Sequence, residues 1–335
     1  MASESSTVPL FAEEYARGVR AGDATVLARA ITLIESTAPQ HAADAVELMK
    51  LLLPHRDHSV RIGITGVPGV GKSTFIEAFG LYLCEQGHRV AVLAVDPTSV
   101  VSGGSILGDK TRMEKLSRHL AAYIRPSPSG GALGGVTRKT RETITLCEAA
   151  GYDVILIETV GVGQSEIAVR SMTDFFLLLA LTGAGDELQG IKKGIVEMAD
   201  AIAVTKADGD NVIAAERLQS ELAQVLHLLA PATAGWKPEV LTCSAVKGSG
   251  IPEVWAVVEK FRKEMTASGE WGARRLRQVQ EGLVEFAREQ VLAGMHESTV
   301  VQQDLNVFGG MVAEGKMALR EAAGKVAADF LASKR

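Results

Sequence analysis

The sequence lacks the features typical of secreted or membrane-spanning proteins. Its three cysteines, Cys84, Cys147 and Cys243, lie far apart and show no C-x-x-C spacing. We therefore expect reduced, buried thiols rather than disulfides. No apolar run approaches the roughly 20 residues that cross a bilayer. The first residues carry no basic patch followed by an apolar stretch. These absences predict a cytoplasmic protein without a membrane partner.

Aromatic residues and positive charge are also scarce. Aromatics make up 5% of the chain and the formal net charge is −5. A nucleic-acid partner is not expected, because such proteins need basic surfaces and stacking side chains. The hydrophobic content of 47% is ample for a core. The totals therefore predict one large folded domain with smaller additions.

Three regions follow one another along the chain. Residues 1–55 are predicted to form a helical extension, with Asp23 as the N-cap of an amphipathic helix. Residues 56–262 alternate short apolar strands with helices, which predicts an α/β domain with a mostly parallel sheet covered on both faces. The strands are expected at residues 60–65, 89–95, 121–125, 153–158, 175–181, 200–205 and 240–243.

Residues 263–335 form the third region and show no strand pattern. Apolar residues recur at helical spacing from Leu276 to Met295. We expect an interruption at Gly309-Gly310 and another amphipathic helix from Met311 to Leu331. The region is either a helical cap on the α/β domain or an arm that joins two copies of the chain. The length of the apolar stripe favours the dimerisation arm.

The strongest motif is G-V-P-G-V-G-K-S, which fits the phosphate-binding pattern G-x-x-x-x-G-K-[ST] without a mismatch. It lies between a predicted strand and a predicted helix, so backbone N–H groups can converge on nucleotide phosphates. Lys72 adds a positive charge, and Ser73 offers a hydroxyl to Mg²⁺. The predicted phosphate-binding residues are Gly66, Val67, Pro68, Gly69, Val70, Gly71, Lys72, Ser73 and Thr74.

Three acidic residues are candidates for binding Mg²⁺ together with Ser73. Glu158 ends a buried strand in an E-x-x-G motif, whose Gly161 allows a backbone N–H to approach the γ-phosphate. Asp96 follows another strand, and Asp109 lies on a glycine-rich loop that could respond to the bound nucleotide. Each acid has a plainer alternative, as the cap of a helix. The sequence predicts a magnesium site with Ser73, Asp96, Asp109 and Glu158.

Two further motifs indicate guanine rather than adenine. The stretch T-K-A-D resembles the guanine-reading motif N-K-x-D, with Thr205 in place of Asn. A carboxylate at Asp208 would accept hydrogen bonds from guanine N1–H and N2–H₂, a pair that adenine cannot donate. Lys206 would lie along the base. The motif S-A-V-K resembles the loop that closes over guanine. The predicted guanine-binding residues are Thr205, Lys206, Asp208, Ser244, Ala245 and Val246.

A glycine-rich loop at 183–194 carries Lys192 and Lys193. A mobile lysine near the γ-phosphate could stabilise charge that develops during phosphoryl transfer. The alternative is a surface loop with a solvated pair of lysines.

Together these motifs resemble one known family. The stretches V-G-Q-S-E, G-G-S-I-L-G-D-K-T-R-M and G-A-G-D-E-L-Q-G-I-K-K-G resemble those of the MeaB/ArgK-type GTPases. Those proteins are chaperones of adenosylcobalamin-dependent acyl-CoA mutases, chiefly methylmalonyl-CoA mutase. The resemblance covers about residues 20–265. It implies the P-loop fold of signal-recognition-particle and MinD proteins, and a homodimer formed by the C-terminal arm.

The resemblance also implies a mechanism. Lys72, Glu158 and Lys192 would be the catalytic residues, and Lys192 would swing towards the nucleotide when the mutase binds. GTP hydrolysis to GDP would be slow alone and faster with the mutase. It would gate cofactor loading and protect the mutase from inactivation. Adenosylcobalamin would belong to the mutase, because this chain has no D-x-H-x-x-G motif. The adenosyltransferase that supplies the cofactor is a further candidate partner.

The alternative function is a GTPase that inserts nickel into an enzyme. Such a protein needs a store of histidines or cysteines. His55-Arg56-Asp57-His58 is the sole histidine cluster in the sequence, and it has no cysteine nearby. The sequence therefore favours the mutase chaperone.

Overall fold

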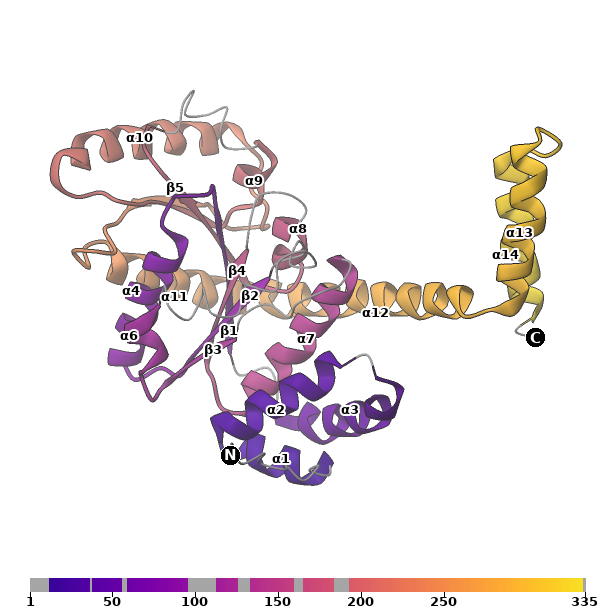
Figure 1. Cartoon of the computed structure of the whole chain (residues 1–335). Coiled ribbons are helices and arrows are strands. Elements are labelled where there is room, and N and C mark those ends of the chain that lie inside the picture. The colour runs from indigo at the N-terminus through magenta and orange to yellow at the C-terminus, as the bar shows by residue number, and fades with distance from the viewer. Residues whose placement is uncertain are drawn as a thin grey trace, which may run out of the picture. The chain divides into compact units, whose positions relative to one another are not determined.

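The computed structural model describes residues 12–36, 38–55, 59–95, 113–125, 133–159, 165–183 and 193–333. The chain divides into two compact units, Met1–Gln278 and Val279–Arg335. The first contains the sheet and the second is helical in its described part (Figure 1).

The first unit is built on one seven-stranded sheet in which every pair of neighbouring strands is parallel. The strand order is β3-β2-β4-β1-β5-β6-β7, so β1 lies between β4 and β5. All seven strands agree with the sequence prediction to within about two residues. The strands are β1 (Val60–Gly66), β2 (Val90–Val95), β3 (Ala122–Arg125), β4 (Val154–Thr159), β5 (Phe175–Ala180), β6 (Ala201–Val204) and β7 (Glu239–Thr242).

Both faces of the sheet are covered by helices (Figure 1). Alternate residues of each strand enter opposite cores: Ile62 of β1 packs on one face, and Ile155 of β4 on the other. The central strands are therefore apolar throughout, as expected for a parallel sheet. The helices that follow strands are α4 (Lys72–Glu85), α6 (Glu114–Ser117), α7 (Leu133–Ala149), α8 (Ser165–Arg170), α9 (Lys193–Met198), η2 (Gly209–Asn211), α10 (Val212–Leu228) and α11 (Ile251–Ser268).

The N-terminal extension packs against the α7 side of the sheet. It consists of α1 (Ala12–Arg20), α2 (Ala24–Glu35), α3 (Pro39–Leu52) and the short η1 (Leu53–His55). Buried side chains of α2 and α3 join the core formed by the α7 face of β2 and β4. Asp23 is the N-cap of α2, as predicted, and its carboxylate accepts from the backbone N–H groups of Thr25 at 2.8 Å and Val26 at 3.0 Å.

Helix α12 (Glu270–His296) follows α11 after Gly269, whose φ of 80° suits glycine at the end of a helix. The first unit extends to Gln278. The first turns of α12 make polar contacts with Thr173 and Asp174, which directly precede β5.

The second unit holds the rest of α12 with α13 (Thr299–Ala313) and α14 (Leu319–Ser333). The expected interruption at Gly309-Gly310 is wrong, because α13 runs through both glycines and the break comes at Gly315, which has a φ of 72°. Each glycine costs about 1 kcal/mol relative to alanine. The packing of α13 on α14, through Val301 and Phe330, maintains the helix.

The three cysteines are free and buried. Burial raises the pKa of the Cys84 thiol to about 11 and that of Cys243 to about 12, and it also raises the pKa of Cys147. Among the described helices, none is long and apolar enough to span a bilayer.

Replacing the α2 cap, Asp23→Ala, should lower the free energy of unfolding by about 1 kcal/mol, because two backbone N–H groups lose their acceptor. Urea unfolding followed by circular dichroism measures this. Asp44→Ala is the matched control, since Asp44 is exposed within α3 and caps nothing. Equal losses in the two variants would contradict the capping role.

Candidate active site

The described candidate residues gather at one edge of the sheet. Every strand runs in the same direction, so the segments that follow β1, β4, β6 and β7 emerge at the same edge. The phosphate loop follows β1, Glu158 and Thr159 end β4, and T-K-A-D follows β6. Four predicted residues lie outside the described part of the chain. They are Asp96, Asp109, Gly161 and Lys192.

The phosphate loop turns sharply between β1 and α4. Gly69 and Gly71 have φ values of 81° and 95°, which residues with side chains rarely adopt. A Cβ on Gly66 would lie 2.6 Å from the carbonyl oxygen of Leu179, so only glycine fits beside β5. The Val70 N–H donates to Val67 O at 3.2 Å and closes the turn. The loop therefore leads directly into the N-terminus of α4, where free N–H groups can receive phosphate.

Lys72 is folded back over this loop. Its ammonium donates to Gly66 O at 2.7 Å. Burial lowers the pKa of Lys72, and the negative charges of Glu158 and Glu166 oppose that shift. The Lys72 ammonium thus donates to backbone carbonyl oxygens. A triphosphate is a stronger, charged acceptor and would replace these carbonyls as its partner.

Ser73 and Glu158 provide oxygens suited to Mg²⁺. Ser73 Oγ donates to Glu158 Oε1 at 3.5 Å, and Glu158 is only 5% exposed. Buried carboxylates are costly unless they meet a cation or hydrogen-bond donors. A hydroxyl and a carboxylate at this separation fit Mg²⁺, which binds oxygen ligands at about 2.1 Å and keeps several waters. Bound Mg²⁺ would neutralise charge on the β- and γ-phosphates.

Thr205, which directly follows β6, connects the T-K-A-D motif to the phosphate loop. It is buried, and its hydroxyl lies 2.7 Å from Val70 O and 3.2 Å from Ala180 O. A hydroxyl can make this connection as an amide can, which gives a physical reason for Thr205 in place of Asn. The next residue, Lys206, has a φ of 56° and donates to Gly69 O at 2.9 Å. Its side chain therefore reaches the phosphate loop.

Asp208 and Ser244 lie together. The Ser244 hydroxyl donates to Asp208 Oδ2 and also accepts from the Lys247 N–H at 3.1 Å. Gly250 allows this loop to fold back on β7, because a Cβ there would lie 2.2 Å from Thr242 O. Ala245 is half-buried and Val246 is 79% exposed. The structure thus brings the T-K-A-D and S-A-V-K motifs into contact at Asp208.

Sequence reasoning missed two residues around this site. Asn211 donates to Lys206 O at 2.8 Å and accepts from the Thr182 hydroxyl at 2.7 Å, so it helps to hold the T-K-A-D loop. Glu166, at the start of α8, is 1% exposed and its charge acts on Lys72. Asn211 could have been suspected as a polar residue just before α10. Glu166 belongs to V-G-Q-S-E, but nothing local indicates that it is buried.

The parallel sheet with a phosphate loop after β1 defines the class: this is a P-loop NTPase. Comparison with known proteins narrows the class. The sequence profile described as "Methylmalonyl Co-A mutase-associated GTPase MeaB" matches residues 27–300. The chain therefore belongs to the family of methylmalonyl-CoA mutase-associated GTPases, as the sequence motifs predicted.

Individual relatives agree with this assignment. The chain is 55% identical to "Probable GTPase Rv1496" of Mycobacterium tuberculosis over 86% of each chain. It is 50% identical to GTPase ArgK of Escherichia coli over 83% of this chain and 82% of the relative. It is 47% identical to "Methylmalonic aciduria type A homolog, mitochondrial" of Mus musculus over 93% of this chain and 78% of the relative. Among solved structures, one described as LAO/AO transport system kinase superposes with a TM-score of 0.76 at 36% identity, and the match covers 99% of both chains.

The variant Asp208→Asn should weaken GTP binding by about 10- to 100-fold, because it removes charge-assisted hydrogen bonds to guanine. Xanthosine triphosphate should bind better to the variant than to the wild type. Xanthine carries a 2-oxo group that can accept from the Asn amide. Fluorescent-nucleotide titration measures both affinities.

The matched control is Asp210→Asn, an exposed acid two residues further along the chain. Unchanged affinities for both nucleotides in Asp208→Asn would show that this carboxylate does not read the base.

Proposed function

We propose that this GTPase is a chaperone of an adenosylcobalamin-dependent acyl-CoA mutase, with methylmalonyl-CoA mutase as the first candidate. GTP hydrolysis would gate cofactor loading and protect the mutase from inactivation. The observation that carries the proposal is the match over residues 27–300 to a family named for its association with methylmalonyl-CoA mutase. The mouse relative named for methylmalonic aciduria supports the same partner.

The proposal gives each site residue a role. Lys72 would leave Gly66 O and bind the β- and γ-phosphates. Ser73 and Glu158 would hold Mg²⁺ with Asp96 and Asp109 or through its waters. The backbone of Gly161 would contact the γ-phosphate, and Lys192 would complete the site when the mutase binds. These assignments follow from the positions of Lys72, Ser73 and Glu158 and from the family motifs.

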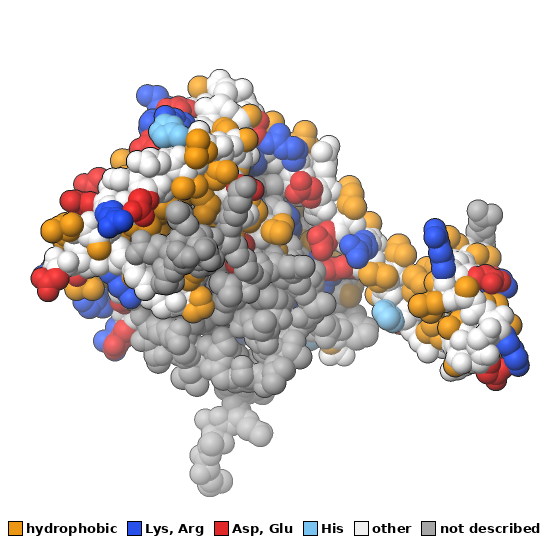
Figure 2. Space-filling view, turned by 90° about the horizontal axis from the view of Figure 1, so that it is seen from above, with side chains coloured by type: hydrophobic (Ala, Val, Ile, Leu, Met, Phe, Trp, Pro, Cys, Tyr) orange, Lys and Arg blue, Asp and Glu red, His pale blue; other side chains and the backbone are white. Residues whose placement is uncertain are grey.

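The proposal includes a homodimer formed through the C-terminal helices, with residues 1–55, 56–262 and 263–335 as extension, GTPase domain and arm. The second unit has a small described core, to which Val301, Val326 and Phe330 contribute. Hydrophobic side chains lie on its surface (Figure 2). Exposed apolar surface of this kind favours association with another chain. The large exposed apolar residues of α13 and α14 are Leu305, Val307, Leu319 and Leu331.

Adenosylcobalamin is assigned to the mutase and not to this chain, and the adenosyltransferase is proposed as a further contact. We place the protein in the cytoplasm, which suits its free, buried thiols. Nickel insertion is the alternative function, and Arg56, Asp57 and His58 of the histidine cluster lie outside the described residues.

Phosphate release from GTP and from ATP, with and without a purified adenosylcobalamin-dependent mutase, tests the proposal. We expect slow release from GTP alone, faster release with the mutase and little release from ATP. Lys192→Ala should abolish the acceleration and keep the basal rate, because its cation would act only in the complex.

Lys193→Ala is the matched control and should keep the acceleration. Equal rates with and without several such mutases would overturn the chaperone proposal and leave the GTPase. Faster release from ATP than from GTP would contradict the roles of Lys206 and Asp208.

A further inference from the structure

Lys206, the second residue of T-K-A-D, has a backbone conformation that needs support. Its φ of 56° is left-handed, and no other residue besides glycine has a positive φ in the part of the chain that the structure describes. A residue with a side chain loses about 1 kcal/mol or more in this conformation, which persists only where neighbouring contacts hold it. The contacts around Lys206 must therefore offset that cost.

Backbone hydrogen bonds on both sides of Lys206 fix its neighbours. The Thr205 N–H donates to Ala180 O at 2.8 Å, and the Ala207 N–H donates to Cys243 O at 3.0 Å. The first bond ties the motif to the end of β5, and the second ties it to the segment after β7. Neither bond holds the carbonyl group of Lys206, whose direction follows from the left-handed turn.

The side chain of Asn211 holds that carbonyl group. Its amide Nδ2 donates to Lys206 O at 2.8 Å, and its Oδ1 accepts from the Thr182 hydroxyl at 2.7 Å. A carbonyl oxygen only accepts, so the amide nitrogen must face Lys206 and the amide oxygen must face Thr182. Asn211 therefore bridges the chain that leaves β5 and the chain that leaves β6.

The backbone of Asn211 closes the same turn around Asp208. The Asp208 N–H donates to Lys206 O at 2.9 Å, and the Asn211 N–H donates to Asp208 O at 3.0 Å. A carbonyl oxygen has two lone pairs, so Lys206 O can accept from Asp208 and Asn211 together. The direction of this one carbonyl thus helps to determine where the Asp208 carboxylate lies, and that carboxylate accepts from the Ser244 hydroxyl.

The Asn211 side chain supports neither a helix end nor the core. Asn211 directly precedes α10, but its side chain makes no capping bond to that helix. It is partly exposed, so its removal opens no cavity in the core. Loss of this side chain would leave α10 and the sheet in place and would deprive Lys206 O of its side-chain donor.

We propose that Asn211 is a positioning residue for guanine recognition. By bridging Thr182 and Lys206 O, it holds Lys206 in the left-handed conformation and thereby fixes the Asp208 carboxylate. In this role Asn211 acts through Lys206 and Asp208 and does not itself touch the nucleotide. The inference rests on the assignment of Asp208 as the residue that reads guanine.

The variant Asn211→Ala tests this role through nucleotide selectivity. Inosine triphosphate is the probe, because it lacks the 2-amino group of guanine and can donate only its N1–H to Asp208. We expect Kd to rise about tenfold for GTP and about threefold for inosine triphosphate, so the preference for GTP should fall about threefold. Competition against a fluorescent nucleotide measures both affinities.

The variant Asn211→Asp separates the two hydrogen bonds of the bridge. Aspartate keeps the shape of the side chain and still accepts from Thr182, but its carboxylate cannot donate to Lys206 O. We expect it to lower the preference for GTP at least as much as Asn211→Ala does. In both variants KM for GTP should rise about tenfold and kcat should stay within about twofold, because the phosphate loop keeps its contacts.

Gln219→Ala is the matched control. Gln219 of α10 also donates a side-chain amide to a backbone carbonyl, Val240 O, at 2.8 Å. That acceptor lies within β7 and not in a guanine motif. The control should therefore keep the wild-type preference for GTP, although it loses a comparable hydrogen bond.

An unchanged preference for GTP in folded Asn211→Ala and Asn211→Asp, or an equal loss in Gln219→Ala, would overturn the inference. If Asn211→Ala does not fold, Asn211→Asp decides alone. The variant Asp208→Asn identifies which step fails. If it weakens GTP binding while the Asn211 variants keep the preference, only the role of Asn211 is wrong. If it leaves GTP binding unchanged, the assignment of Asp208 is wrong and the inference fails with it.

Discussion

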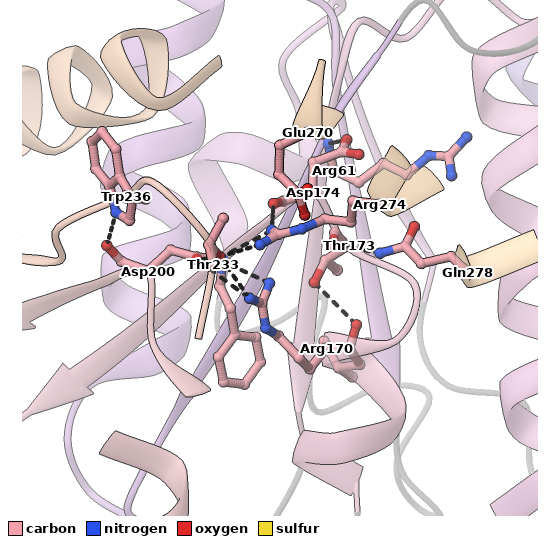
Figure 3. Close-up of polar contacts among 12 residues, drawn as sticks. Arg61, Arg170, Thr173, Asp174, Asp200, Thr233, Trp236, Glu270, Arg274 and Gln278 are labelled. Atoms are coloured by element: carbon pink, nitrogen blue, oxygen red, sulfur yellow. Dashed lines mark hydrogen bonds and ion pairs between the residues drawn. The ribbon is translucent and has the colours of Figure 1, made fainter. Parts of the chain in front are cut away.

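A sheet in which all strands are parallel must be covered on both faces, and this constraint organises the first unit. Helices return the chain across one face or the other, so the segments that follow the strands all emerge at a common edge. The phosphate loop, Glu158, T-K-A-D and S-A-V-K meet there. The opposite edge presents the first N–H groups of the strands. Asp174 and Asp200 accept two of them, from Arg61 at 2.9 Å and Phe176 at 2.9 Å. These carboxylates in turn attract the arginines of α8 and α12 (Figure 3).

The two edges differ in the kind of contact that holds their charged side chains. At the nucleotide edge, charged groups such as Lys72 and Glu158 are held by contacts that a ligand can replace. At the other edge, Arg275 and Asp174 pair through two hydrogen bonds; Asp174 is almost fully buried and Arg275 is partly buried. Replacing either partner there would leave a buried charge without its counterion, which is strongly destabilising. Charged side chains at the nucleotide edge can therefore exchange their hydrogen-bond partners for a ligand. Those at the other edge keep a fixed arrangement.

Much of this arrangement could be predicted from the sequence because its causes are local. Apolar runs predicted the seven strands, Asp23 predicted the start of α2, and G-V-P-G-V-G-K-S predicted the phosphate loop. The buried network could not be predicted, because Arg274 and Asp174 are 100 positions apart and neither has a local pattern. The break between α13 and α14 was misplaced for a related reason: packing between helices outweighed the low helix propensity of Gly309-Gly310. Asp96, Asp109, Gly161 and Lys192 remain predictions.

The free cysteines have a practical consequence. Thiols react as thiolates, and burial raises the pKa of Cys84, Cys147 and Cys243. The folded protein should therefore resist alkylating reagents and air oxidation, and any labelling would report a local opening of the chain. Cys243 directly precedes Ser244, and its carbonyl accepts from the Ala207 N–H at 3.0 Å. The rate of Cys243 alkylation would therefore report how often the T-K-A-D loop opens, and bound nucleotide should lower that rate.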